Sequence, residues 1–345
     1  RVSGRSLVLA CLIGMGVSIA VVAAAPSLPV LALALFAWGL SASLYHPAAL
    51  TLLSRATHAR GRAFALHGLA GNVGVATGPL LAAILLGVLN WRLVAAVLVT
   101  PVILAIVAAL RLEFDETAGM RTRTDAETDG GTRIASLGDF LAGSKLLFAG
   151  GFALVFIVGI LYGLYYRGAM TFLPDILADL PLFEPAVLWG ETFEPSRYVY
   201  AGLLLLGGVG QYVGGWLVDA IRTEVALLLG YGGLAVIGVL FIPLTDAGLV
   251  PLLVGAGVLG FAVFAIPPIN QEAISTYSPA DLRGLSFGYN YTGIFGIGAL
   301  GATLAGAVLT RWTPGVLFLV LAGIAVLATL FTSLLFGSWD RVGST

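Results

Sequence analysis

The sequence predicts an all-α polytopic membrane protein. Hydrophobic residues make up 59% of the 345-residue chain, charged residues make up 10%, and the mean hydropathy is +1.01. A soluble core cannot bury that much apolar surface. A helix needs roughly 20 apolar residues to cross a hydrocarbon core of about 30 Å, and runs of that length recur about ten times. Composition and run length therefore indicate the same fold class.

The expected membrane spans follow one another along the whole chain. They cover residues 7–25, 30–53, 64–89, 93–110, 146–173, 198–218, 225–244, 249–269, 285–309 and 316–336. The polar segment 111–145, rich in Thr, Asp, Glu and Gly at its start, is expected to be a flexible cytoplasmic linker. It separates an N-terminal bundle of four spans (1–110) from a C-terminal bundle of six (146–345). A second long loop, about 174–197, joins the first two spans of the C-terminal bundle.

The basic residues predict the orientation of these spans. An even number of spans places both termini on one side, and the other side then receives only Arg92, Arg167, Arg197 and Arg311. All the remaining Lys and Arg residues lie on the side of the termini. Because cytoplasmic loops carry the excess of positive charge, both termini are expected in the cytoplasm and the protein in the cell membrane. We expect a monomer.

A glycine-rich stretch, 60–79, is repeated later in the chain. A shift of 223 residues brings Arg60 and Gly61 onto Arg283 and Gly284. The first copy opens the third span and the second copy opens the ninth, which is the fifth span of its bundle. If both bundles follow one plan of six spans, the first bundle lacks two helices at its start. Parallel repeats of this kind occur in transporters that rock two bundles about a central site.

Three short motifs lie at residues 1–5, 74–79 and 215–222. Together they resemble motifs of the major facilitator superfamily, and residues 74–79 are similar to the G-x-x-x-G-P motif found in exporters of that family. Residues 215–222 are similar to its G-x-L-x-D-R loop motif, and residues 1–5 to the end of the first-half copy of that motif. The residues that carry the first two motifs are Gly74, Gly78, Pro79, Gly215, Asp219 and Arg222. The resemblance implies a two-bundle transporter in which the spans seen here correspond to family helices three to twelve.

The same resemblance implies a conformational role for the motif residues. In the family, the motif aspartate lies near the positive end of a helix from the other bundle and favours one access state. In this chain that helix is the one that begins near Arg62, so Asp219 is expected beside it. Gly74 and Gly78 are expected to permit close helix packing while the bundles move.

A second, local resemblance concerns residues 44–49. The segment Leu-Tyr-His-Pro-Ala-Ala, which contains Tyr45 and His46, is similar to a Phe-His-Pro segment of fosmidomycin-resistance-type drug exporters. A histidine within the membrane can relay protons because its ordinary pKa is about 6.5. A neutral histidine bonded to a neighbouring helix is the alternative for His46.

Polar residues near the end of the eighth span form a second candidate group. Asn270, Gln271 and Glu272 follow the double proline at 267–268, which removes backbone donors and is expected to open the helix. Pseudo-symmetry places Glu272 roughly opposite His46. A solvated carboxylate at an ordinary helix end is the alternative.

Aromatic residues and one arginine gather near the outer end of the fifth span. Tyr162 and Tyr166 share a helical face and could stack on an aromatic or amphipathic substrate, while Arg167 could attract an anion. An interfacial aromatic belt with an arginine that reaches toward the membrane surface explains them as well.

Several function classes are excluded by the sequence. The basic residues form no patch for nucleic acid, and no G-x-x-x-x-G-K loop is present to couple ATP to transport. No serine–histidine, HExxH or paired-carboxylate arrangement indicates an intramembrane enzyme, and Cys11 alone builds no metal cluster. We therefore expect no cofactor, no metal and no catalytic residue. The expected function is secondary transport of a small molecule, and proton-coupled efflux is the favoured form. The alternatives are an importer or uniporter of a metabolite or anion, and an inactive truncated transporter.

Overall fold

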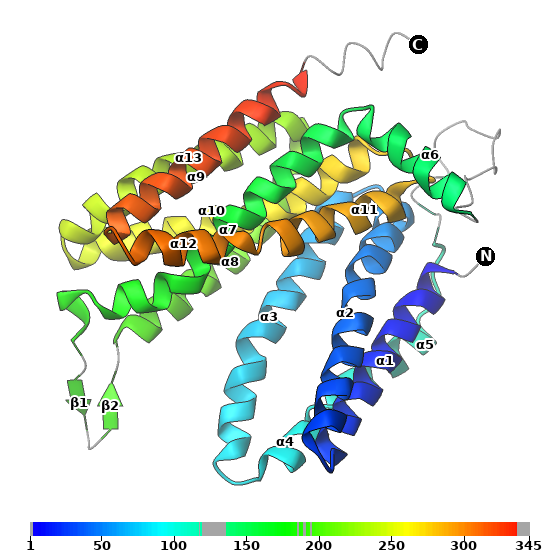
Figure 1. Ribbon diagram of the computed structural model, residues 1–345, viewed down its shortest axis with the longest axis horizontal. Coiled ribbons are helices and arrows are strands. Elements are labelled where there is room, and N and C mark those ends of the chain that lie inside the picture. Colours follow the sequence, from blue (N-terminus) through cyan, green and yellow to red (C-terminus); the bar gives the residue numbers. More distant parts are fainter. Residues whose placement is uncertain are drawn as a thin grey trace. The chain divides into compact units, whose positions relative to one another are not determined.

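The computed structural model describes residues 3–116, 118, 136–184, 186–188, 191–193 and 195–336; of residues 75, 76, 79, 80, 83, 186–188 and 191–193 it describes the backbone only. Within this part of the chain, helices dominate and one short hairpin supplies the strands (Figure 1). Nine of the helical stretches described are long and apolar enough to cross a membrane. The remaining expected span corresponds to α3 (Arg60–Leu86), which is 27 residues long. The all-helical membrane fold is therefore confirmed.

The chain forms two compact units. One unit comprises Arg1–His58 and Ala70–Asp129, and the other comprises Ala59–Leu69 and Gly130–Thr345. The first turns of α3 thus pack within the second unit, although they precede the linker in sequence. This placement matters for the functional site below.

In the first unit, α1 (Gly4–Ala24) packs against α2 (Leu28–Ala56), α4 (Trp91–Val97) and α5 (Thr100–Arg111). The span expected at 93–110 is divided into α4 and α5, because a proline in the first turn of α5 cannot donate to the preceding turn. The carboxylate of Glu116 accepts hydrogen bonds from the backbone N–H groups of Gly4 (2.9 Å) and Arg5 (3.1 Å). The Arg5 guanidinium in turn donates to the carbonyls of Ala109 (3.0 Å) and Leu110 (2.7 Å). These hydrogen bonds join the start of α1 to the end of α5 and to the residues that follow it.

The second unit is a bundle in which α8 (Pro195–Ala220) packs on α10 (Leu249–Thr276) and α9 (Thr223–Asp246) packs on α13 (Pro314–Ser333) (Figure 1). The stacked rings of Phe241 and Phe318, with centroids 4.4 Å apart, fix the second pair. α7 (Phe152–Ala178) lies against α13, against α12 (Leu300–Leu309) and against the segment η3 (Gly293–Ile297) that continues α11 (Arg283–Thr292).

Two helix boundaries differ from the expected ones. Part of the segment expected as flexible linker forms α6 (Leu137–Phe148), which begins with a capping box between Ser136 and Asp139. α7 then begins at Phe152 and continues through Pro174 to Ala178, whereas the sequence predicts a single span over 146–173. The later boundaries move the midpoint of α7 to Tyr165, so Arg167 lies about 3 Å beyond the middle of the helix and not near its outer end.

The loop after α7 contains the only strands in the part of the chain described. A 3₁₀ turn, η2 (Pro181–Phe183), precedes β1 (Ala186–Leu188), which pairs in antiparallel register with β2 (Glu191–Phe193). A two-stranded hairpin of this length has little stability alone.

Candidate functional site

The first turns of α3 pack against α8 with backbone in contact with backbone. A Cβ atom added to Gly61 would overlap the carbonyl oxygen of Gly215, and one added to Gly215 would overlap the carbonyl oxygen of Gly61. Glycine is needed at both positions because any side chain would force the helices apart. The glycines that permit this close approach are therefore Gly61 of the repeat and Gly215 of the loop motif.

Asp219, near the end of α8, caps the start of α3. Its two carboxylate oxygens accept hydrogen bonds from the backbone N–H groups of Gly61 (3.1 Å) and Arg62 (3.1 Å). These N–H groups belong to the first turn of α3, where they have no partner within the helix. The negative charge also interacts favourably with the positive end of the helix dipole. The structure thus places Asp219 at the helix start that the motif resemblance indicates.

Arg60, the first residue of α3, forms an ion pair with Glu272 of α10. One Nη atom lies 2.5 Å from Oε1 of Glu272, and the hydroxyl of Thr276 donates to the same oxygen at 3.2 Å. The other carboxylate oxygen of Glu272 is buried and has no hydrogen-bond partner among the residues described. We call Arg60, Gly61 and Arg62 with Gly215, Asp219 and Glu272 the α3–α8–α10 contact.

The second copy of the repeat lies close to this contact. The rings of Phe64 and Phe287, which the 223-residue shift superimposes, meet edge to face with centroids 6.3 Å apart. Arg283 begins α11 and donates to the carbonyl of Ser275 at 3.3 Å, and Gly284 follows it on the exposed side. Related residues of the two repeat copies therefore contact each other directly.

Arg222 differs from the other motif residues. It donates to Glu224 of α9 (3.3 Å), and its guanidinium also lies 5.3 Å from the centroid of the Phe336 ring. Glu224 also accepts a hydrogen bond from Tyr277. Arg222 therefore helps to fix the start of α9, whereas Asp219 acts on α3.

The expectation that the double proline opens α10 is wrong. The helix runs without interruption from Leu249 to Thr276. Pro267 has no N–H to donate to the carbonyl of Val263 four residues earlier, and the hydroxyl of Tyr162 donates to that carbonyl instead, at 3.3 Å. A neighbouring helix thus replaces the lost backbone hydrogen bond. Tyr162 is buried and has this structural contact in addition to any role toward substrate.

Because α10 stays helical, the three polar residues after the prolines are buried, not solvated. Asn270 accepts a hydrogen bond from Tyr231 of α9 (3.0 Å), and Gln271 shares one with Tyr291 of α11. Nδ2 of Asn270 and Oε1 of Gln271 have no partner among the residues described. Buried polar groups without partners are uncommon and indicate a place where water or a ligand binds.

Tyr166 follows Tyr162 on the same face of α7, and Arg167 is the next residue along the helix. The centroid of the Tyr166 ring is 5.9 Å from that of Tyr162, and it is also 5.9 Å from that of Phe264 of α10, with an interplanar angle of 88° between the Tyr166 and Phe264 rings. The Arg167 guanidinium lies 5.9 Å from the centroid of Tyr166 and 5.9 Å from that of Phe295. The structure thus adds Phe295, which the sequence alone did not single out.

Tyr45 and His46 belong to the first unit. Their rings meet edge to face with centroids 5.6 Å apart, next to Pro47 inside α2. Glu272 belongs to the second unit, so the predicted pairing of His46 with Glu272 stays a prediction.

Gly74 and Gly78 also lie in the first unit. Among the described residues of that unit, no atom would lie within 4 Å of a Cβ added at either position. The side chain of Pro79 is outside the described part of the chain. Their role in close packing is likewise untested.

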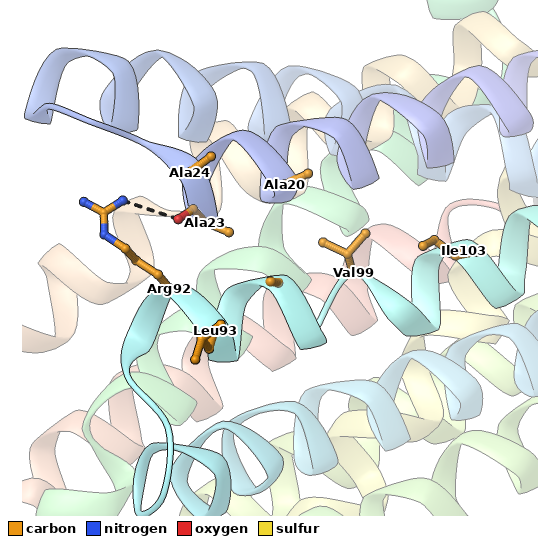
Figure 2. A pocket seen from close by; sticks show the side chains of 8 residues that line it. Ala20, Ala23, Ala24, Arg92, Leu93, Val99 and Ile103 are labelled. Carbon is orange, nitrogen blue, oxygen red and sulfur yellow. Dashed lines mark hydrogen bonds between the residues drawn. The ribbon is translucent and has the colours of Figure 1, made fainter.

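A cavity of the first unit, about 450 Å³, lies between α1 and α4–α5 (Figure 2). Alanines and aliphatic residues line it, and Arg92 is its charged residue. The Arg92 guanidinium donates to the carbonyls of Ala23 (3.3 Å) and Ala25 (2.6 Å) and stacks on Trp91. Because this guanidinium is used to fix the end of α1, the cavity offers few polar groups to orient a substrate. Among the residues described, no three His, Cys, Asp or Glu side chains are grouped to hold a metal ion.

Comparisons with known proteins give a consistent result. The family model of the Major Facilitator Superfamily matches residues 1–290, and no curated protein matches the chain. Among solved structures, a variant of the E. coli fucose:proton symporter FucP has a TM-score of 0.67 at 13% identity, covering 96% of this chain and 83% of that one. The human organic anion transporter MFSD10 has a TM-score of 0.70 at 18% identity, covering 96% and 77%. The proton:xylose symporter XylE, bound to 6-bromo-6-deoxy-D-glucose, has a TM-score of 0.69 at 14% identity, covering 95% and 79%. At these low sequence identities, the structural likeness shows that the folds are similar and nothing more.

Proposed function

The chain belongs to the Major Facilitator Superfamily, a family of transporters and not of enzymes, and we propose from that premise that it is a proton-coupled exporter of a small amphipathic molecule. The observation that carries the proposal is the α3–α8–α10 contact. Alternating access requires helices of the two repeats to separate and rejoin at one end of the protein. A contact made of one ion pair and two helix-capping hydrogen bonds can be broken and remade without unfolding either helix.

The buried carboxylate of Glu272 supports proton coupling. While Arg60 lies beside it, the negative charge is compensated. When the contact separates, the carboxylate loses the positive charge of Arg60, and the loss of a neighbouring positive charge favours the protonated form of a carboxyl group. Proton binding and the separation of α3 from α10 are thereby linked. His46 and Tyr45 are proposed as a second titratable pair on the proton or substrate pathway.

The remaining elements of the proposal come from the sequence. The preference for efflux depends on the Gly74–Pro79 resemblance to exporters, and on the local similarity of residues 44–49 to fosmidomycin-resistance-type exporters. The excess of basic residues on the side of the termini supports a protein of the cell membrane with both termini in the cytoplasm. With cytoplasmic termini, the α3–α8–α10 contact lies at the cytoplasmic end. The two helices expected before α1, and a monomeric state, belong to the same proposal.

The experiment uses inside-out vesicles and a panel of fluorescent amphipathic probes that includes ethidium. The probe that the wild-type transporter moves fastest is then used for all variants. We expect Glu272→Gln to exchange probe across the membrane but to lose accumulation driven by a proton gradient. Glu224→Gln, which changes another buried carboxylate of the same unit, is the matched control. This variant should keep the accumulation of probe driven by a proton gradient. Wild-type flux that ignores a protonophore would refute the coupling.

A second candidate function is favoured by Arg167. A transporter of the same fold that imports or equilibrates an anionic metabolite would use this arginine as the attracting charge. Inward flux that saturates and does not depend on a proton gradient would support this candidate over the exporter.

A further inference from the structure

We propose that Arg167, Tyr166 and Phe295 form the binding site for an anionic group attached to a flat ring, so that the transported substrate is an aromatic organic anion. The inference deepens the proposed transport function, which it takes as given. It concerns the second unit alone, in which α7 and η3 supply these three residues.

The position of Arg167 is the first observation. It lies about 3 Å beyond the midpoint of a 27-residue helix, and such a helix is about 40 Å long. An arginine there lies nearer the middle of the helix than its outer end, which favours a place on the substrate path over an interfacial belt. Charged residues at this depth face a protein interior or a water-filled path, and they mark substrate or ion pathways.

The second observation is what surrounds the guanidinium. Among the described residues, no carboxylate lies within 4 Å of it, and the ion pairs of this part of the chain involve other arginines. The rings that lie near it among the described residues are those of Tyr166 and Phe295, each with a centroid 5.9 Å away. Ring faces stabilise a cation without neutralising it. The charge of Arg167 therefore remains available to a ligand.

The rings themselves are held in place by further aromatic contacts. Phe295 stacks on Tyr291 with centroids 5.4 Å apart and an interplanar angle of 27°. Tyr166 is fixed by its edge-to-face contact with Phe264. Half of the Phe295 side chain is nevertheless exposed, so part of its ring is accessible beside the positive charge of Arg167.

The backbone of η3 shows why Phe295 lies here. Gly298 donates to the carbonyl of Gly293 at 2.8 Å, five residues earlier, so this segment is a turn of π-helix. A Cβ atom added to Gly163 of α7 would lie 2.6 Å from the carbonyl oxygen of Ile294. The glycine lets α7 and η3 approach closely, which brings Phe295 to Arg167. Single π-helical turns inside membrane or soluble helices occur frequently at functional sites.

The ligand class follows from these groups. A guanidinium offers a planar fork of donors that matches the two oxygens of a carboxylate or the oxygens of a sulfonate. Tyr166 and Phe295 add flat apolar surfaces on which an aromatic ring can stack. A neutral sugar or an inorganic anion would use only part of this arrangement. An aromatic carboxylate or sulfonate would use all of it.

The test measures equilibrium binding of 2-naphthoate to the full-length transporter in lipid nanodiscs, with empty nanodiscs subtracted. The neutral, isosteric 2-naphthamide and the non-aromatic cyclohexanecarboxylate are the comparison probes. We expect wild-type protein to bind 2-naphthoate about tenfold more tightly than 2-naphthamide, as one charge-assisted pair of hydrogen bonds allows. Arg167→Gln should abolish this preference and leave binding of 2-naphthamide unchanged.

Two further variants separate the parts of the site. Arg167→Lys should keep the preference for the anion but reduce the preference for 2-naphthoate over cyclohexanecarboxylate, because an ammonium lacks the planar surface. Phe295→Leu should reduce that same aromatic preference. Arg311→Gln removes an arginine in the turn after α12 and serves as the control, with unchanged binding expected.

The inference is overturned if wild-type protein shows no preference for 2-naphthoate over 2-naphthamide, or if Arg167→Gln retains it. It is also overturned if Arg311→Gln abolishes the preference to the same extent. Binding is measured without a proton gradient, so its outcome is independent of the coupling test. Anion binding together with gradient-independent flux would remove the exporter proposal and leave this site intact. Gradient-driven flux without a preference for the anion would remove this site and leave the exporter proposal intact.

Discussion

The substitution Asp219→Asn tests the α3–α8–α10 contact with a change of one atom. The wild-type carboxylate accepts hydrogen bonds from the N–H groups of Gly61 and Arg62, each at 3.1 Å, and places a negative charge at the start of α3. An asparagine keeps one acceptor oxygen and no charge. The variant therefore loses one charge-assisted hydrogen bond and the interaction with the helix dipole, while α8 keeps a side chain of nearly the same shape.

The magnitude follows from these two losses. A hydrogen bond to a charged group contributes about 1.5 kcal/mol at the lower end of its range, which suits a side chain that is 23% exposed. A charge beside a helix terminus adds about 0.5 kcal/mol. Together they amount to about 2 kcal/mol, or about a 30-fold change in the equilibrium between the closed and separated states of the contact.

Hydrogen–deuterium exchange at the start of α3 measures this equilibrium directly. The amides of Gly61 and Arg62 exchange when the contact separates, so their rates should rise by up to about 30-fold in Asp219→Asn. Asp246→Asn, at the exposed end of α9, is the control and should leave these rates unchanged. Unchanged exchange at α3 in a correctly folded Asp219→Asn protein would refute the reasoning, as would an equal rise in the control.

Two other substitutions test the packing that supports the site. Gly215→Val places a side chain against the Gly61 backbone and should destabilise the protein by about 1 to 3 kcal/mol, visible as a lower thermal unfolding temperature. Gly233→Val, where an added Cβ meets no described atom within 4 Å, should have little effect, and an equal loss in both variants would contradict the close approach. Tyr162→Phe removes the donor to the Val263 carbonyl and should weaken α10 locally by about 0.6 to 1.7 kcal/mol. Faster amide exchange around the double proline is the expected signal, and exchange identical to wild type would show that the hydroxyl is not needed there.

The fold could be predicted from the sequence because membrane spans leave a strong local signal. A run of about 20 apolar residues has few alternatives to a helix in a bilayer, and the described spans correspond to expected ones. The helix ends could not be predicted as well, since they depend on tertiary contacts. Pro174 lies inside α7, where the sequence predicts a helix end. Glu116 caps α1 although the two lie far apart in sequence.

The site was predictable only in part. Arg60 was identified from the repeat, Asp219 from a motif and Glu272 from its place after the double proline, but nothing in the sequence indicates that Arg60 and Glu272 form an ion pair. Likewise, the partner of Asn270 is Tyr231, which no motif marks. Contacts between distant helices depend on helix rotation and register, and a hydropathy pattern defines these only loosely.

The end of α10 shows how one tertiary contact alters a functional interpretation. From the sequence, the double proline predicts an open helix whose polar residues meet water. In the structure, the Tyr162 hydroxyl satisfies a carbonyl that the prolines leave free, the helix continues, and Glu272 is buried beside Arg60. A solvated carboxylate would change little when α3 moves, whereas a buried one must exchange an arginine for a proton. The tyrosine that appeared to be a substrate contact is therefore one condition for the proposed proton coupling.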